Sequence, residues 1–272
     1  MRWDKSVKLP LIVAIVTVLI SLIVEPVERA GSIRALSVLT FNVHHGAGAD
    51  GVVDLDGLAA EIAVSGADVV GLQEVDRHYG DRTGFVDQPA ELAARLDMQV
   101  AFAPNYVLEP LTSGAPPREH GVVLLSRFPI LSSAQTLLPK AVPEEEQRGL
   151  LEAVIDVDGV AVRVLTTHLE PGVTAARLLQ AQAVAAVVER SVEPVVLTGD
   201  LNATPDAPEI TTLTTLLADS HVGPAGFTYP VEAPAVRIDY VLADGRFERS
   251  EVLSTASSDH VPVLARVLLG VP

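Results

Sequence analysis

Residues 194–202, with the sequence PVVLTGDLN, join an apolar run to a polar ending. The apolar part, residues 194–198, is typical of a buried strand, and the ending supplies Asp200 and Asn202. Five other stretches set polar residues into an apolar run in the same way: TFNVHHG at 40–46, LQEV at 72–75, TTHL at 166–169, RIDY at 237–240 and SSDHVPV at 257–263. Together they predict one converging site rich in carboxylates and imidazoles. That chemistry suits a hard divalent cation and a phosphate ester.

Apolar patterning divides the chain into alternating strands and helices. Strands are expected at residues 33–41, 67–75, 99–104, 121–126, 130–138, 150–157, 160–167, 194–198, 236–243, 247–253 and 261–268. Helices are expected at residues 54–66, 87–96, 173–190 and 210–217. The dipeptide Asp158-Gly159 is a strong signal for a two-residue hairpin. Two rounds of strand and helix with hairpins between them predict an α/β fold, in which two sheets face each other and helices lie outside.

The segments between these elements predict a rim of loops around a cleft. Residues 81–85, 106–119, 141–147 and 223–234 are rich in glycine and proline or in charge, as loops that carry function often are. No tandem repeat, low-complexity tract or linker divides the chain after its first thirty residues. Residues 31–272 are therefore expected to form one catalytic domain.

Composition limits the classes of partner. Hydrophobic residues make up 49% of the 272 residues, which is enough for a substantial core. The formal net charge of −16 repels polyanions, so stable, sequence-independent binding to nucleic acid is disfavoured. A nuclease is still compatible with this charge, because a bound metal ion reverses the sign locally. The absence of cysteine excludes disulfides, zinc–thiolate sites and cysteine nucleophiles.

Residues 1–30 are expected to form a separate N-terminal segment. Three basic residues, Arg2, Lys5 and Lys8, precede an uncharged run at 9–24. As a helix this run would span about 24 Å, short of the roughly 30 Å hydrocarbon core, so a cleaved signal peptide and a short uncleaved anchor both remain open. A buried helix is disfavoured because the run has no polar face. Since flanking positive charges stay cytoplasmic, we expect the domain to be extracytoplasmic, either secreted or anchored to the cell membrane.

The order of the motifs, from TFNVHHG through LQEV, GVVLLSRFPI, TTHL, GDLN and RIDY to SSDHVPV, resembles the endonuclease/exonuclease/phosphatase superfamily. That superfamily includes DNase I-like nucleases, abasic-site endonucleases, inositol polyphosphate phosphatases and neutral sphingomyelinases. The resemblance covers residues 33–269. It implies a DNase I-like, four-layer α/β/β/α sandwich with its site at the rim where the two sheets meet. It also implies phosphoesterase chemistry with Mg²⁺ or Mn²⁺.

The metal ligands are expected near Glu74. This carboxylate follows an apolar strand, where desolvation is costly without a cation or a hydrogen-bond donor, although a loop carboxylate or helix cap is the simpler alternative. The resemblance implies that Glu74 is the principal metal ligand, with Asn42 beside it. Asp259 is expected to act through metal binding or a hydrogen bond. His44 stands two positions after Asn42, where nuclease members often carry an aspartate, which puts a second metal contact there in doubt; His44 or His45 can serve instead.

The catalytic candidates are five polar residues. Asp200 and Asn202 are two apart, so on extended backbone they would point to the same side, although an ordinary turn is the alternative. The resemblance implies that they orient water or phosphate. Asp239 and His260 are the best candidates for a carboxylate–imidazole pair that takes a proton from water. For His168, the resemblance implies donation to a phosphate oxygen as negative charge builds.

Two arginines are candidates to clamp phosphate. Arg148 precedes a strand on the rim, and Arg82 lies in a loop flanked by glycine. A solvated surface charge is the preferred interpretation for Arg82. For Arg148, phosphate binding and a solvated charge remain equally open.

The resulting hypothesis is direct attack by water on a phosphoester, without a covalent intermediate. The preferred substrate is a phospholipid or other small phosphoester near the membrane, which the N-terminal segment would approach if it is not cleaved. The alternative is a secreted DNase-like nuclease, although only 4% of the residues are aromatic and no basic–aromatic cluster offers DNA a surface. A non-catalytic binding domain on the same fold is the third possibility. We expect a monomer.

Overall fold

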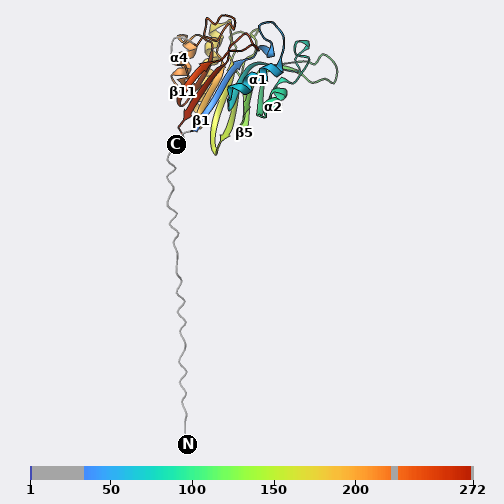
Figure 1. The fold of residues 1–272 in the computed structure, drawn as a ribbon. Coiled ribbons are helices and arrows are strands. Elements are labelled where there is room, and N and C mark those ends of the chain that lie inside the picture. Colours follow the sequence, from blue (N-terminus) through green and yellow to red (C-terminus); the bar gives the residue numbers. More distant parts are fainter. Residues whose placement is uncertain (2–33, 222–225, 271–272) are drawn as a thin grey trace. The chain divides into compact units, whose positions relative to one another are not determined.

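The computed structural model describes Met1 and residues 34–221 and 226–270, which build two six-stranded sheets (Figure 1). The first sheet has the order β11 (Arg246–Val252), β12 (Val263–Leu269), β1 (Arg34–Asn42), β2 (Val69–Arg77), β4 (Arg118–Ser126) and β3 (Gln99–Leu108). The second has the order β5 (Ile130–Leu137), β6 (Gly149–Val157), β7 (Val160–His168), β8 (Val195–Asp200), β10 (Asp239–Ala243) and β9 (Ala218–Asp219). Both sheets are mixed, since β1 and β2 run parallel, as do β7 and β8, among antiparallel neighbours.

The two sheets face each other across an apolar core. Val38 of β1 and Val122 of β4 pack in the same buried cluster as Val164 of β7 and Val196 of β8. Side chains alternate along a strand, so Leu39 next to Val38 lies on the opposite face of the first sheet. The central strands are therefore buried on both faces, which explains their nearly continuous apolar sequence.

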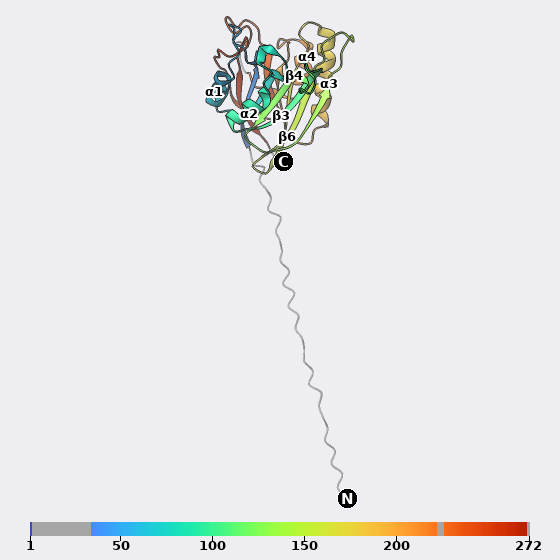
Figure 2. The same ribbon diagram turned by 90° about the vertical axis from the view of Figure 1, so that its right-hand side faces the viewer.

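Helices cover the two outer faces. The helices α1 (Leu55–Ser65) and α2 (Gln88–Leu96) pack on the first sheet, whereas α3 (Thr174–Arg190) and α4 (Pro208–Thr214) pack on the second. Figure 2 shows these pairs on opposite sides of the strands. The predicted four-layer α/β/β/α sandwich is thus confirmed.

Local chemistry sets the ends of the first two helices. The Asp54 side chain accepts a hydrogen bond from the Gly57 amide at 2.9 Å, and the Asp87 side chain accepts one from the Ala90 amide at 3.1 Å. Both carboxylates satisfy amides that have no partner within the helix. The helix α1 ends at Ser65 and is capped by Gly66, whose φ of 67° is left-handed, a conformation that costs glycine little.

Several predicted boundaries were wrong. The strand β3 extends to Leu108, and β4 already begins at Arg118. A bulge between Pro104 and Tyr106 lets the two strands remain paired past the proline. The strand β10 starts at Asp239 rather than residue 236, since the Ile238 amide bonds to the Thr228 side chain instead of a strand. The helix α4 starts two residues early, at Pro208, and the two-residue β9 was not predicted.

The expectation of a signal peptide or anchor at residues 1–30 falls outside the described residues, apart from Met1. Among residues 34–221 and 226–270, no helix is long and apolar enough to cross a membrane.

Candidate active site

Two parallel strand pairs, one in each sheet, bring the polar endings to one edge of the sandwich. Asn42 ends β1 beside β2, and His168 ends β7 in register with Asp200 at the end of β8. Parallel strands end at the same edge, so these side chains converge. The Asn42 amide Nδ2 donates to Asp200 Oδ2 at 3.1 Å, which links the two sheets directly.

Glu74 reaches this edge from a bulge in β2. Its backbone φ is 60°, and the pairing of β2 with β4 shifts register between Leu72 and Val75. The prediction that Glu74 ends its strand was therefore wrong, since β2 continues to Arg77. The Asn42 amide Nδ2 also donates to Glu74 Oε1 at 3.1 Å, so one amide bridges Glu74 and Asp200. The Glu74 side chain keeps 28% of its surface exposed, enough to meet a ligand from solvent.

Asp239 and His260 form the predicted carboxylate–imidazole pair. His260 Nδ1 lies 2.9 Å from Asp239 Oδ2, and both side chains are buried. The other ring nitrogen, Nε2, lies 3.7 Å from Asp200 Oδ2. Burial opposes a charged imidazole, but Asp239 and then Asp200 outweigh it and raise the pKa of His260 to about 9. The ring is therefore held with Nε2 facing Asp200, and it can act as a base only when a bound cation lowers this raised pKa.

Asp200 lies at the centre of the site. Burial, reinforced by the charge of Asp239, raises the pKa of the Asp200 carboxyl to about 7, against the opposing effect of His260 and Asn42. Asp239 Oδ1 is buried and has no hydrogen-bond partner among the described residues. A buried carboxylate oxygen without a partner is costly, so the site is built to receive a cation or a proton donor.

His168 is a neutral donor candidate at the end of β7. Its Nε2 lies 3.4 Å from Asp200 Oδ2, and its Nδ1 lies 4.0 Å from Glu74 Oε1. Burial and then the nearby Arg148 guanidinium hold the pKa of His168 well below its ordinary value. A neutral imidazole keeps one N–H to donate to a phosphate oxygen.

The sequence predicted that Asn202 and Asp200 point to the same side of a strand, and this prediction was wrong. The strand β8 ends at Asp200, and Asn202 has a left-handed φ of 49°. Its backbone amide donates to Asp200 Oδ1 at 3.0 Å, and its side-chain Nδ2 donates to the Leu169 carbonyl at 2.9 Å. Asn202 therefore holds the turn that orients the Asp200 carboxylate, which is the turn alternative considered for this motif.

Asp259 precedes β12 and lies in the loop before it. Its Oδ1 lies 3.9 Å from His44 Nδ1. The neighbouring Ser258 hydroxyl donates to the Asn42 carbonyl at 2.7 Å and accepts from the His260 amide at 3.1 Å. Ser258 thus ties this loop to β1, and the sequence contained no signal for that contact.

Arg148 is buried rather than solvated. Its Nη1 lies 3.4 Å from Glu146, and its Nε lies 3.9 Å from Glu170 with no hydrogen bond to any described residue. An arginine that is buried near His168 and incompletely paired is suited to binding a phosphate.

Arg82 is exposed, as expected of a surface charge, but it is also paired with a buried carboxylate. Its Nε and Nη2 bond to the two carboxylate oxygens of Asp76 at 2.8 and 2.7 Å, and its guanidinium lies over the Tyr79 ring. His120 Nδ1 lies 2.8 Å from the same carboxylate. The His120 and Arg82 hydrogen bonds lower the pKa of Asp76 despite its burial. Sequence reasoning missed this cluster because its partners are 6 and 44 residues away from Asp76.

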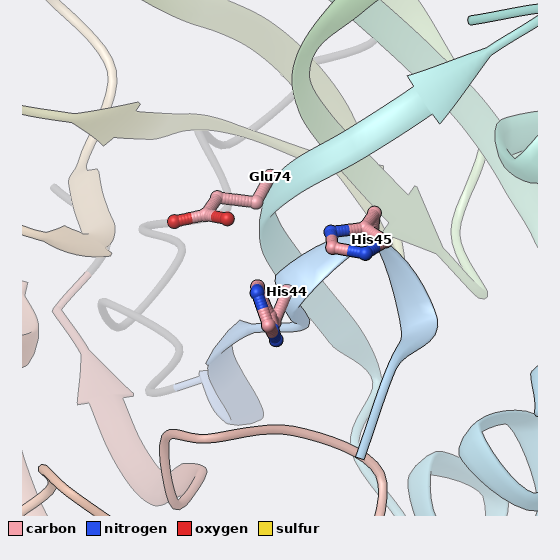
Figure 3. Close-up of side chains that lie close together, drawn as sticks. All are labelled: His44, His45 and Glu74. Carbon is pink, nitrogen blue, oxygen red and sulfur yellow. The ribbon is translucent and has the colours of Figure 1, made fainter. Parts of the chain in front are cut away.

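The residues fit a divalent cation. Two groups of side chains each place three ligand atoms within 4.8 Å of one another: Asp200, Asp239 and His260 form one, and His44, His45 and Glu74 form the other (Figure 3). Burial, followed by the Arg82 charge, lowers the pKa of His45 to about 4, so its imidazole is neutral at physiological pH. Carboxylate oxygens and neutral imidazoles are the donors that divalent ions take in proteins.

Two mixed sheets with helices outside and a carboxylate–imidazole site at the strand ends define an α/β sandwich of the DNase I-like architecture. The chain belongs to the endonuclease/exonuclease/phosphatase family, whose model matches residues 39–260. The superfamily resemblance in the sequence is thereby confirmed. Members of this family are hydrolases that generally use a divalent metal ion.

Solved structures share this fold. An endonuclease/exonuclease/phosphatase from Beutenbergia cavernae is 28% identical, with a TM-score of 0.73 over 87% of this chain and 72% of that one. A mannosyl-6-phosphatase from Bacteroides thetaiotaomicron is 16% identical, with a TM-score of 0.68 over 86% and 99% of the two chains. The human nocturnin catalytic domain with bound sulfate is 19% identical, with a TM-score of 0.63 over 88% and 96%. No curated protein matches the sequence.

Proposed function

We propose that this protein is a divalent-metal-dependent phosphoesterase that hydrolyses a phosphodiester or phosphomonoester by direct attack of water. The observation that carries the proposal is the orientation of His260. Asp239 holds Nδ1 at 2.9 Å, which leaves Nε2 directed toward Asp200 at 3.7 Å. A base fixed in this way takes a proton from a water molecule between it and the substrate.

The charge that develops on the phosphate needs donors on the other side of the site. His168 is neutral and buried, and Arg148 adds a buried positive charge beside it. Both groups are positioned before the substrate arrives, so they stabilise developing charge without the cost of reorganisation. Asn202 acts through Asp200, because its amide orients the Asp200 carboxylate.

Glu74 and Asn42 would hold the metal ion, Mg²⁺ or Mn²⁺, and Asp259 lies on the same side of the site, near His44. When bound, the ion supplies Lewis-acid polarisation of a phosphoryl oxygen. The Asn42 amide uses both N–H groups, on Glu74 and Asp200, and its Oδ1 keeps a lone pair beyond the one that accepts from the His44 amide. The two side chains are thus oriented as a pair before the ion binds.

The preferred substrate is a phospholipid or a small phosphoester rather than nucleic acid. The net charge of −16 opposes the approach of a polyanion far more than that of a single phosphate group. A mannosyl-6-phosphatase shares the fold, so the architecture is compatible with small phosphomonoesters. A secreted DNase-like nuclease is the second candidate, because the family includes nucleases.

We further propose that the enzyme acts outside the cytoplasmic membrane, secreted or held by its N-terminal segment. The support is the basic flank followed by the uncharged run at residues 9–24. Protease added to intact cells should digest an anchored enzyme, and a secreted one should be found in the medium. Protection from protease with no secreted form would place the enzyme inside the cell and contradict this proposal.

The activity is tested with the full-length protein on three substrate classes in parallel, each with Mg²⁺ or Mn²⁺ and with a chelator. The substrates are phospholipid vesicles, small phosphomonoesters and phosphodiesters, and supercoiled plasmid. His260→Gln should abolish turnover, while His78→Gln should not, because His78 lies outside the site and bonds to the Phe85 carbonyl. Plasmid nicking that His260→Gln abolishes would replace the preferred substrate class with nucleic acid. A folded, metal-binding protein without activity on any of the three would refute the enzymatic proposal.

A further inference from the structure

An apolar cavity lies between the loop that follows β2 and the hairpin loop that joins β3 to β4. Its volume is about 380 Å³, within the range of about 300–1,000 Å³ that is typical of small-molecule sites. Phe85 of the first loop and Leu111, Ala115 and Pro116 of the second form its apolar walls, and Arg118 of β4 adds a positive charge. The cavity is thus separate from the residues proposed to bind the metal ion and to activate water.

Two large apolar side chains at this cavity remain exposed. Phe85 keeps 38% of its surface exposed, and Leu111 keeps 61%. Apolar surface that gathers around a concave site marks a binding site, whereas single scattered residues do not. Phe85 also has a φ of 57°, which is rare for a bulky residue, and its amide donates to the Gly80 carbonyl at 3.0 Å. The loop therefore holds an aromatic side chain at the cavity at an energetic cost.

Arg118 joins the two walls of the cavity. Its Nε donates to the Glu109 carbonyl in the hairpin loop at 2.9 Å, and its Nη1 donates to the Tyr79 carbonyl in the loop after β2 at 3.4 Å. One guanidinium thus fixes the two loops relative to each other. Because the walls are already held in place, a ligand that enters between them meets little of the cost of ordering the loops.

A line of side chains leads from this cavity to the active site. Arg118 and His120 are two residues apart on β4, so their side chains point to the same face and lie about 7 Å apart along the strand. The ring of Tyr79 lies 5.8 Å from that of His120 between centroids. Burial, followed by Arg148 and His120, holds the pKa of His168 well below its ordinary value, so His120 lies close to the groups that would receive the phosphate. A substrate bound there can extend past His120 toward Arg118.

We propose that this cavity binds the apolar chain of the substrate, which is an anionic amphiphile: a phosphoester that carries an alkyl or acyl chain. The inference rests on the proposed function and names the substrate class within it. Charge supports this occupant, because Arg118 lies at the apolar walls and Arg82 lies over the neighbouring Tyr79 ring, although the chain has a net charge of −16. A fully polar substrate such as a sugar phosphate would leave Phe85 and Leu111 exposed to water.

The test measures by calorimetry how alkylphosphonates of increasing chain length bind to the full-length protein with Mn²⁺. The carbon–phosphorus bond of these probes is not hydrolysed, so binding is measured apart from turnover. Between butylphosphonate and decylphosphonate, each added methylene that enters the cavity should tighten Kd about 3- to 4-fold.

Two variants and a matched control locate the chain. Leu111→Asn removes apolar wall and Ala115→Phe fills the cavity; both positions are exposed, so neither change should prevent folding. Both variants should lose the dependence on chain length and bind butylphosphonate like the natural chain. Leu131→Asn is the control, because Leu131 of β5 is 60% exposed, nearly the same as Leu111, and lies outside the cavity. It should keep the full dependence on chain length.

Affinity that is independent of chain length in the natural protein, or a dependence that persists in both variants, would overturn the proposal. Flotation with phosphatidylcholine vesicles distinguishes a second source of apolar chains. Vesicle binding that Leu111→Asn abolishes, without any preference for longer phosphonates, would mean that the loops contact a membrane and do not enclose a single chain. A protein that prefers long phosphonates but hydrolyses no phosphoester would refute the enzymatic proposal and leave the chain-binding cavity standing.

Discussion

Asn42 Nδ2 lies 3.1 Å from Asp200 Oδ2 and joins the end of β1 in one sheet to the end of β8 in the other. The two residues are 158 positions apart, and both side chains are buried. The same amide also holds Glu74 Oε1 at 3.1 Å. One asparagine thus sets the spacing between the group proposed to bind metal and the group that faces the base.

Asn42→Ala should therefore weaken both metal binding and folding. Mg²⁺ affinity is expected to fall about 10- to 100-fold, because Glu74 loses its orienting donor as well as its neighbouring ligand. The free energy of unfolding is expected to fall by about 1–3 kcal/mol, since Asp200 Oδ2 loses a buried donor. Calorimetric Mg²⁺ titration and urea unfolding measure the two effects. Unchanged Mg²⁺ affinity in the variant would remove Asn42 from the metal site.

Asp239→Asn should lower the pKa of His260 in the metal-free protein. In the folded chain this pKa is raised from 6.5 to about 9, mainly by Asp239 acting against burial. The stability that His260 contributes is thus fully present below pH 6.5 and is lost as the pH rises through about 9. Asparagine removes the charge, so the pKa should move back toward 6.5 and this pH dependence should shrink. NMR titration of the His260 ring measures this pKa. Unfolding experiments below pH 6.5 and above about pH 9 measure the change in stability. A His260 ring that titrates alike in both proteins would contradict the pairing.

Arg148→Gln should reduce turnover and alter His168. The variant keeps a polar side chain but removes the buried positive charge, so we expect kcat/KM to fall by about 10²- to 10³-fold. The pKa of His168 should rise, although burial will still hold it below its ordinary value. Arg266→Gln is the control, because Arg266 is an exposed partner of Glu248 and should leave both quantities unchanged. If Arg148→Gln and Arg266→Gln change the His168 pKa and kcat/KM to the same extent, Arg148 has no specific role in the site.

Gly71→Ala should destabilise the sandwich at a close contact between its two sheets. A Cβ at Gly71 of β2 would overlap the Thr198 hydroxyl of β8 and would lie 2.9 Å from Thr166 Oγ1 of β7. We expect the free energy of unfolding to fall by about 1–3 kcal/mol, because the buried strands cannot shift freely. Gly80→Ala, where a Cβ meets no atom within 4 Å, is the matched control. Equal stability of the two variants in urea would show that the sheets separate easily at this point.

Much of this architecture could be predicted from local patterns in the sequence. Strands such as β7 and β8 are continuous apolar runs, and Asp54 marks the start of α1 with a side chain that caps it. Polar endings after buried strands led to Asn42, Glu74 and Asp200, because such groups need a partner wherever they are buried. The hydrogen bond between Asp239 and His260 was predicted from their chemistry and is present at 2.9 Å.

Other features depend on contacts that no local window contains. The bulge at Glu74, the left-handed turn at Asn202 and the ion pair of Arg82 each depend on partners brought in by tertiary packing. A positive φ at a residue other than glycine is one such feature. Its energetic cost is offset by tertiary hydrogen bonds such as that from the Gln88 side chain to the His45 carbonyl.

The amino-acid sequence by itself determined the elements, the family and the set of side chains at the strand ends, because apolar periodicity and residue chemistry are local properties. Only the tertiary structure decided which of these side chains meet. It joined Asn42 to Asp200 across the two sheets and placed His44 and His45 beside Glu74. The physical reason is that burial, hydrogen bonding and charge act between groups that only folding brings within a few ångströms of each other.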